Sequence, residues 1–337
     1  MALLPRKPDL LGRVERALQA GGWNVLYLTG PGEHPARYRI EKDGTYHTLK
    51  VYIWNVTHGG GNRNVAEYRI QITGINPQQF IPEITGKTLI LGYWTAEDVF
   101  AGFDYSFHDG PLGGSASLQI GEQALLGANQ QRFAMHEKGN GELAVAFMPD
   151  FLGSYVDNLA ALHATGQVPA EVDLLARLAA DPAAVPQAEI DATIASHRQF
   201  AITKTRRALR ALDFRSRVLT AYSHRCAMCS VQLRLVDGAH ILPVSEPAST
   251  DETANGIALC ALHHRAYDRG LLTFDGHFRT HINDLQVQEL TNSGLDGGIA
   301  AFGGAVRHVI HLPASVLDRP NPAFVAQANS LRGWTFR

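Results

Sequence analysis

Cysteines, charged residues and long apolar runs are all scarce in this sequence. The chain has 337 residues, of which three are cysteine and 18% are charged. Three cysteines cannot all pair within one chain, which argues against a disulfide-stapled secreted scaffold. No window approaches the roughly 18 consecutive apolar residues of a membrane span. The first residues also lack the uninterrupted apolar core of a secretory signal. We therefore expect a cytoplasmic protein.

What is present indicates an α+β protein. The chain is 45% hydrophobic, and its length suits roughly two domains. A short amphipathic helix at about 10–20 ends at Gly21-Gly22. Short strand-like runs separated by Gly, Asn, Pro or Asp then predict a mostly β domain over 1–150. These runs are 23–29, 36–40, 48–54, 67–73, 88–93, 99–104, 116–120 and 143–148.

A helical connector is predicted to follow over residues 151–215. Ala and Leu dominate there, and the apolar residues recur at helical spacing. Its end is basic: between Arg198 and Arg225 lie eight Lys and Arg residues against one acid, Asp213. Such an imbalance favours a polyanionic partner, although a charge run is also the usual composition of a solvated helix face.

The domain over 1–150 contains few residues that indicate chemistry. Its glycine-rich loop, 58–64, has the composition of a long hairpin turn, with close approach to a phosphate as the alternative. Trp54 and Tyr105 have the ring area to stack on a base, but such aromatics are more often sheet core.

All three cysteines fall in the last part of the chain, within a spacing typical of zinc sites. Cys226 and Cys229 form C-x-x-C, and Cys260 and His263 form C-x-x-H about 30 residues later. Two such pairs match a tetrahedral structural Zn²⁺ site of the Cys3His type. The alternative is three buried thiols with an incidental spacing. A thioredoxin-like redox pair is disfavoured, because no βαβ unit surrounds the motif.

A second set of polar residues lies between and after these pairs. His240 follows a strand-like run, Asn255 lies in an Asn-Gly turn, and His264 directly follows the last zinc ligand. If 261–269 is helical, His264 and Asp268 lie one turn apart on one face. An imidazole and a carboxylate placed in this way can hold one divalent cation.

The order His…Asn…His, flanked by zinc pairs in a strand–loop–strand–helix setting, resembles the HNH family of ββα-metal nucleases. The string AHILP…NGIALCALHHRAYDRGLLTF is especially similar to the HNH modules of bacterial restriction endonucleases, over about 221–280. The resemblance implies a zinc-stapled HNH nuclease domain over 216–337. It also implies cleavage of DNA phosphodiester bonds.

The resemblance implies a role for each matching residue. His240 matches the general base, Asn255 the residue that ties the loop to the base-bearing strand, and His264 the catalytic metal ligand on the helix. Asp268 matches a second ligand, and Mg²⁺ or Mn²⁺ suits such a site. Many relatives place another ligand directly before the base, where this chain has Ala239. The metal is then held either by fewer side chains or with Asp237 as a substitute ligand.

Further expectations concern double-stranded DNA, which we expect as the partner. Candidate backbone contacts come from the basic stretch and from the helix that carries His264; they are Lys204, Arg206, Arg207, Arg210, Arg265 and Arg269. HNH modules have little sequence preference of their own, so the domain over 1–150 is expected to choose the target, either a specific sequence or a modified base.

The expected function is a restriction endonuclease that acts as a dimer, and two alternative functions remain open. One active site per chain and two strands to cut suggest a homodimer. A nicking, mobile-element or phage-type HNH nuclease is one alternative. A zinc-containing DNA-binding protein without activity is the other.

Overall fold

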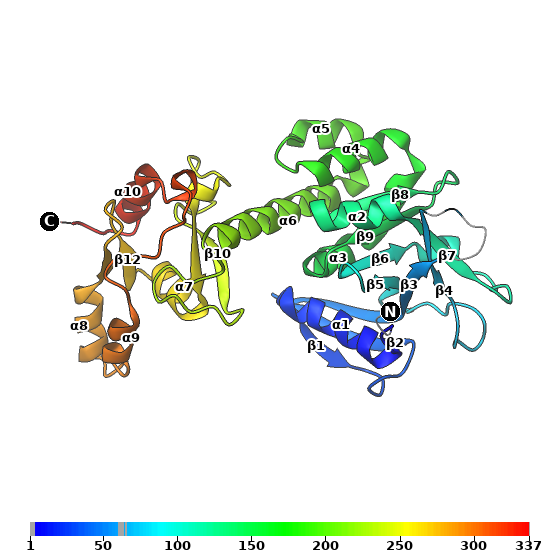
Figure 1. Cartoon of the computed structure of the whole chain (residues 1–337), viewed down its shortest axis with the longest axis horizontal. Helices are drawn as coiled ribbons and strands as arrows, with labels where there is room; N and C mark the ends of the chain where they lie inside the picture. The colour runs from blue at the N-terminus through cyan, green and yellow to red at the C-terminus, as the bar shows by residue number, and fades with distance from the viewer. Residues whose placement is uncertain (1–3, 60–63, 65, 337) are drawn as a thin grey trace. The chain divides into compact units, whose positions relative to one another are not determined.

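The computed structural model describes residues 4–59, 64 and 66–336. It divides into two units, Met1–Leu209 and Arg210–Arg337. The chain passes from one unit to the other inside a single helix, α6 (Ser196–Ala221). Figure 1 colours the elements of both units by their position along the chain, from blue at the N-terminus to red at the C-terminus.

The first unit is built on a nine-stranded sheet with the order β1-β2-β3-β5-β6-β9-β8, to which β4 and β7 add a branch at β3. The parallel pair β3–β5 lies at its centre, and the neighbouring pairs on either side are antiparallel. The strands are β1 (Asn24–Tyr27), β2 (Ala36–Lys42), β3 (Thr45–His58), β4 (Glu67–Gln71), β5 (Lys87–Trp94), β6 (Val99–Phe103), β7 (Ser117–Gly121), β8 (Phe133–Glu137) and β9 (Leu143–Phe147).

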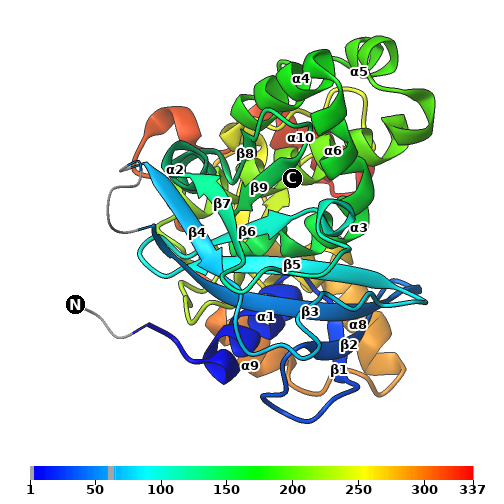
Figure 2. The ribbon, with the colours of Figure 1, turned by 90° about the vertical axis from the view of Figure 1, so that its right-hand side faces the viewer.

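Alternation along the strands gives this sheet two apolar faces. Tyr52, Trp54 and Val56 of β3 point into a core that also contains Leu125 of α2 (Glu122–Gln131). On the other face, Tyr155 of α3 (Leu152–Ala164) stacks on Phe147 with ring centroids 4.4 Å apart. The same helix contacts α1 (Lys7–Ala20), which also lies along β3 (Figure 2).

Helix α1 forms where the sequence predicts it, and its ends have local causes. Pro8 lies in the first turn, and the Asp9 carboxylate accepts a hydrogen bond from the Arg6 amide at 3.1 Å. Gly21 ends the helix. The buried side chains Leu10, Leu11, Val14, Ala17 and Leu18 form the face directed at the sheet.

The α+β class and the mostly β character of the N-terminal part are confirmed. Each of the eight predicted strand runs overlaps a strand, whereas α2 and β8 lack a prediction. Trp54 is buried and its indole donates to the Thr73 carbonyl, so it is sheet core. Residues 60–63 of the glycine-rich loop lie outside the described residues.

The predicted connector consists of α3, α4 (Pro169–Ala180), α5 (Gln187–Thr193) and α6. The first three belong to the first unit, and α6 runs through the boundary at 209/210. Glu171 of α4 is buried and forms an ion pair with Arg198 at the start of α6. This pair joins α4 to α6, while α3 and α4 contact β9 and β8 of the sheet.

The second unit contains the hairpin β10 (Val236–His240) and β11 (Gly256–Cys260), followed directly by α7 (Ala261–Asp268). These elements pack around a core that includes Phe214, Val218 and Tyr222 of α6. The remaining elements are β12 (Leu272–Phe274), β13 (Thr280–Ile282), α8 (Asp284–Asn292), α9 (Ile299–Ala305) and α10 (Pro322–Leu331).

The run 306–312 is rich in Val and Ile, which predicts a strand here, but the structure forms none. The segment makes one isolated bridge, between Val309 and Arg279. Its other backbone groups are divided among different partners: the His311 amide bonds to Ala227 at 2.7 Å, and Ile310 to Phe278 at 3.0 Å. The backbone of this segment therefore bonds to two neighbouring segments in turn and does not pair continuously with one strand. The last helix, α10, follows Asn321-Pro322 and is capped by the Asn321 side chain.

Candidate active site and metal centre

Cys226, Cys229, Cys260 and His263 form one cluster. Their ligand atoms all lie within 4.8 Å of one another. The Sγ atoms of Cys229 and Cys260 are 3.9 Å apart, and His263 Nδ1 is 3.6 Å from Cys226 Sγ and 3.2 Å from Cys260 Sγ. A tetrahedral zinc ion with Zn–S bonds of about 2.3 Å holds its ligands about 3.8 Å apart. The donor set and its spacing therefore fit Zn²⁺.

Local backbone bonds bring the two ligand pairs together. The turn that carries Cys226 and Cys229 docks on β11 through the Ala227 amide, which donates to the Ala258 carbonyl at 2.7 Å. Cys260 ends β11 and His263 lies in the first turn of α7. Burial raises the pKa of the Cys226 thiol to about 12 and lowers the pKa of His263. A cation is therefore needed to hold that thiol as a thiolate.

His240 ends β10 with its ring fixed from two sides. The ring stacks on Phe214 of α6, with centroids 3.7 Å apart and planes 10° from parallel. Its Nε2 atom lies 3.1 Å from Asp251 Oδ1, and the side chain is 18% exposed. Burial lowers the pKa of His240, against an opposing effect of Asp251 that raises it. Nδ1 makes no hydrogen bond to any residue that the structure describes.

Asn255 is buried in the loop that connects β10 and β11. Its Oδ1 accepts from the Leu242 amide at 2.9 Å, two residues beyond His240. Its Nδ2 donates to the Thr250 carbonyl at 2.9 Å and to Ser249 Oγ at 3.1 Å. This one side chain therefore joins both ends of the loop, and it fixes the segment that leaves His240.

His264 and Asp268 lie one turn apart on α7, as predicted, with Nε2 and Oδ2 3.7 Å apart. Their side chains are 33% and 56% exposed, so a hydrated cation has access to both. Ala239 is buried, and Asp237 forms an ion pair with Arg215. Within the described ranges, the Cys3His cluster is the one group of three or more potential ligands. A cation at His264 and Asp268 would complete its shell with water and phosphate oxygens.

The structure thus places the sequence-predicted residues in three local groups of one ββα unit. These are the Cys3His cluster, His240 with Asn255 at the hairpin, and His264 with Asp268 on α7, which packs against both β10 and β11. Asp251 and Phe214 have no signal in the sequence. Asp251 lies in a polar loop, and Phe214 has the ordinary appearance of a helix core residue.

The six candidate DNA contacts separate into two sets. Lys204 pairs with Asp157, Arg206 donates to the Val185 carbonyl, and Arg210 pairs with Asp251, so these three cations are engaged within the chain. The other three, Arg207, Arg265 and Arg269, are exposed.

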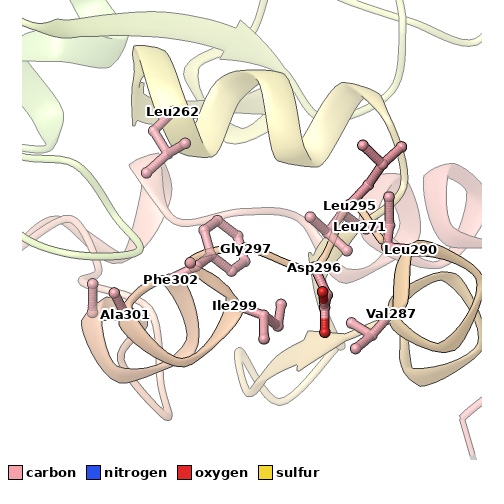
Figure 3. Close-up of a pocket in the computed structure, with 12 residues that line it drawn as sticks. Leu262, Leu271, Val287, Leu290, Leu295, Asp296, Gly297, Ile299, Ala301 and Phe302 are labelled. Carbon is pink, nitrogen blue, oxygen red and sulfur yellow. The ribbon is translucent and has the colours of Figure 1, made fainter. Parts of the chain in front are cut away.

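An apolar pocket of about 440 Å³ lies between α7, α8 and α9 (Figure 3). Leu262, Leu290 and Phe302 contribute to its lining, and Asp296 is the charged residue among the lining side chains. Phe302 also packs against the His263 ring, with centroids 5.5 Å apart. The pocket therefore borders the Cys3His cluster.

Comparison with known families agrees with this geometry. Residues 226–275 match the family model described as HNH endonuclease. This part of the chain is an HNH endonuclease domain. The HNH domain contains the Cys3His cluster, His240, Asn255, His264 and Asp268, and it makes the protein a hydrolase that acts on DNA.

The comparisons add three further findings. Residues 47–156, in the sheet of the first unit, match the family described as Methylase-associated X1. Among solved structures, a modification-dependent TagI restriction endonuclease matches with 13% identity and a TM-score of 0.30, over 83% of this chain and 80% of that chain. No curated protein matches the chain.

None of the helices in the described part of the chain combines the length and apolar character that a bilayer crossing requires.

Proposed function

We propose that the protein is a divalent-metal-dependent restriction endonuclease in which His240 is the general base. The observation that carries the proposal is the state of the His240 ring. Its pKa is lowered by burial, so it is neutral at pH 7, and its Nδ1 has no partner among the described residues. A neutral imidazole with a free nitrogen can take the proton of a water that attacks a phosphodiester.

The other residues prepare this step. Asn255 holds the loop that leaves His240, and Phe214 holds the plane of the ring. His264 and Asp268 would hold Mg²⁺ or Mn²⁺, which would supply charge compensation for the phosphate and the leaving 3′-oxygen. The Cys3His cluster would hold Zn²⁺, which fixes the hairpin to α7 because a ββα unit is too small to bury a sufficient core.

Target choice is assigned to the first unit. Its sheet contains the match to a family described as methylase-associated, which supports a link with DNA modification. The target is then either a short sequence whose modified form is spared or a modified base. Cleavage of both strands by chains with one site each is expected from a homodimer.

A plasmid assay tests the activity. In Mg²⁺ or Mn²⁺, the protein is expected to convert supercoiled DNA to linear form, and His240→Ala is expected to abolish cleavage. His277→Ala is the matched control, because His277 is exposed in a turn. Unmethylated, methylated and hydroxymethylated plasmids identify the target class. Nicked product alone would assign the protein to the nicking enzymes. Cleavage by His240→Ala at the normal rate would exclude His240 as the general base.

DNA backbone contact is proposed for the three exposed cations, Arg207, Arg265 and Arg269. Each phosphate contact releases counterions, so binding should weaken steeply with salt. Replacement of one of these residues by Ala is expected to reduce the slope of log affinity against log salt by about 1. An unchanged slope for all three variants, measured by fluorescence anisotropy, would exclude them as contacts.

A further inference from the structure

Asp251 connects the His240 ring to two arginines of α6. Its Oδ1 faces His240 Nε2 at 3.1 Å, and its Oδ2 accepts from Arg210 Nε at 2.8 Å and Nη2 at 2.6 Å. Its main-chain oxygen accepts from Arg217 Nη2 at 2.7 Å. The carboxylate is therefore fixed through its side chain and its backbone.

The preceding residue is held as well. The Thr250 carbonyl accepts from Asn255 Nδ2, the same amide group that bonds to Ser249. Asp251 thus follows a loop position that is tied to the base-bearing strand. A surface carboxylate in a polar loop would ordinarily be mobile, whereas this one is held beside His240 by its contacts with Arg210 and Arg217.

This geometry selects one form of the imidazole. With a carboxylate at Nε2, the neutral ring places its proton on Nε2 and leaves the lone pair on Nδ1. The same carboxylate stabilises the positive ring that forms when Nδ1 accepts a proton from water. The ring stack on Phe214 fixes the direction in which Nδ1 points.

We propose that Asp251 is a positioning residue for the His240 base, and that Arg210 holds Asp251 in place instead of contacting DNA. The proposal rests on the function proposed for His240. It gives Arg210 a role different from the one expected from the basic composition of its helix. The charged groups that face the His240 ring are Asp251 from the loop and Arg210 from α6.

The two charges act on the base in opposite directions, which gives the test its sign. Asp251 raises the pKa of His240 and Arg210 lowers it. The acid limb of the rate profile should therefore move to lower pH in Asp251→Asn and to higher pH in Arg210→Gln. If these residues acted only in folding, both variants would cleave more slowly, but their acid limbs would stay at the same pH as in the wild type.

The experiment measures single-turnover cleavage against pH for the full chain and its variants, with DNA affinity and zinc content measured in parallel. Asp251→Asn is expected to lose about tenfold to a hundredfold in rate, as for other residues that orient a functional histidine. DNA affinity should stay within about twofold for both Asp251→Asn and Arg210→Gln. Asp251→Glu should recover part of the rate, and Asp284→Asn, an exposed acid on α8, is the control.

Three results would overturn the proposal. The first is normal cleavage and a normal profile in Asp251→Asn. The second is a loss of DNA affinity in Arg210→Gln that accounts for its loss of rate. The third comes from an NMR titration of the His240 ring, which needs no activity: an unchanged pKa in Asp251→Asn would exclude the interaction. If wild type cleaves no DNA but the ring titrations shift as expected, the proposed function fails and the His240–Asp251 pairing stands.

Discussion

At the scale of the residue, His240 is defined by two opposing effects on one ring. Burial against Phe214 removes water and disfavours the charged imidazole, while Asp251 favours it. Burial is the larger effect, so the pKa lies below the ordinary value of 6.5. The proposed base is therefore neutral, and able to accept a proton, across the neutral pH range.

The sign of this shift predicts the pH dependence of the wild-type protein. A base must be neutral to accept a proton, so cleavage should fall only when the pH drops below the lowered pKa of His240. We expect the midpoint of the acid limb below pH 6.5 in single-turnover rates at saturating metal. A midpoint at or above 6.5, reproduced with both Mg²⁺ and Mn²⁺, would contradict a buried base at this position.

Residues differ in how far the sequence reveals them. The cluster of Cys226, Cys229, Cys260 and His263 could be predicted, because the short spacings of these residues are those of zinc ligands. His264 and Asp268 follow from helical periodicity. The contact of Asp251 with His240 could not be predicted, because it spans a loop whose path is set by the hydrogen bonds of Asn255.

At the scale of the element, the hairpin β10–β11 approaches α6 through two glycines. A Cβ atom on Gly256 would lie 2.2 Å from Val218 Cγ2, and one on Gly238 would lie 3.2 Å from the Arg215 Cα. Both values are shorter than ordinary side-chain contacts. The absence of side chains at these positions lets the strands lie close to the helix that carries Phe214.

Gly256→Ala is therefore expected to push the hairpin away from α6. Overpacking of this kind typically costs about 1–3 kcal/mol. The displacement should also disturb the stack of Phe214 on His240, so cleavage should fall together with stability. Urea unfolding and the plasmid assay measure the two effects. Gly276→Ala is the control, because nothing lies within 4 Å of its Cβ position; equal behaviour of both variants would exclude close packing at Gly256.

The elements of the sheet were partly predictable. Apolar runs such as 88–93 and 143–148 locate β5 and β9, since buried strands need such residues. The order of the strands was not predictable, because the parallel β3–β5 pair joins segments separated by β4 and a loop. Strand β8 (FAMHE) has a mixed composition, and its pairing with β9 comes from the tertiary structure.

At the scale of the whole molecule, the chain has two units with separate cores. The proposed zinc ligands all lie in the second unit. The first unit has its own sheet and the helices packed on it, so its stability should not depend on the metal.

Cys226→Ser is therefore expected to affect one unit alone. Loss of a ligand should release zinc, measured by atomic absorption, and lower the unfolding temperature of the second unit while the first unit keeps its own. Differential scanning calorimetry of the full chain should show one transition shifted and one retained. His240→Ala should keep both transitions and the zinc. A joint shift of both transitions, or normal zinc content in Cys226→Ser, would contradict this assignment.

His263 and His264 are consecutive residues with different surroundings, the first buried in the Cys3His cluster and the second half-buried beside Asp268. A single peptide bond therefore separates a proposed zinc ligand from a proposed ligand of the catalytic metal. Deleting or inserting one amino acid ahead of this pair would rotate both imidazoles by about 100°. An insertion or deletion that suits one of the two sites therefore displaces the other, so the position of both histidines on the helix can change only together.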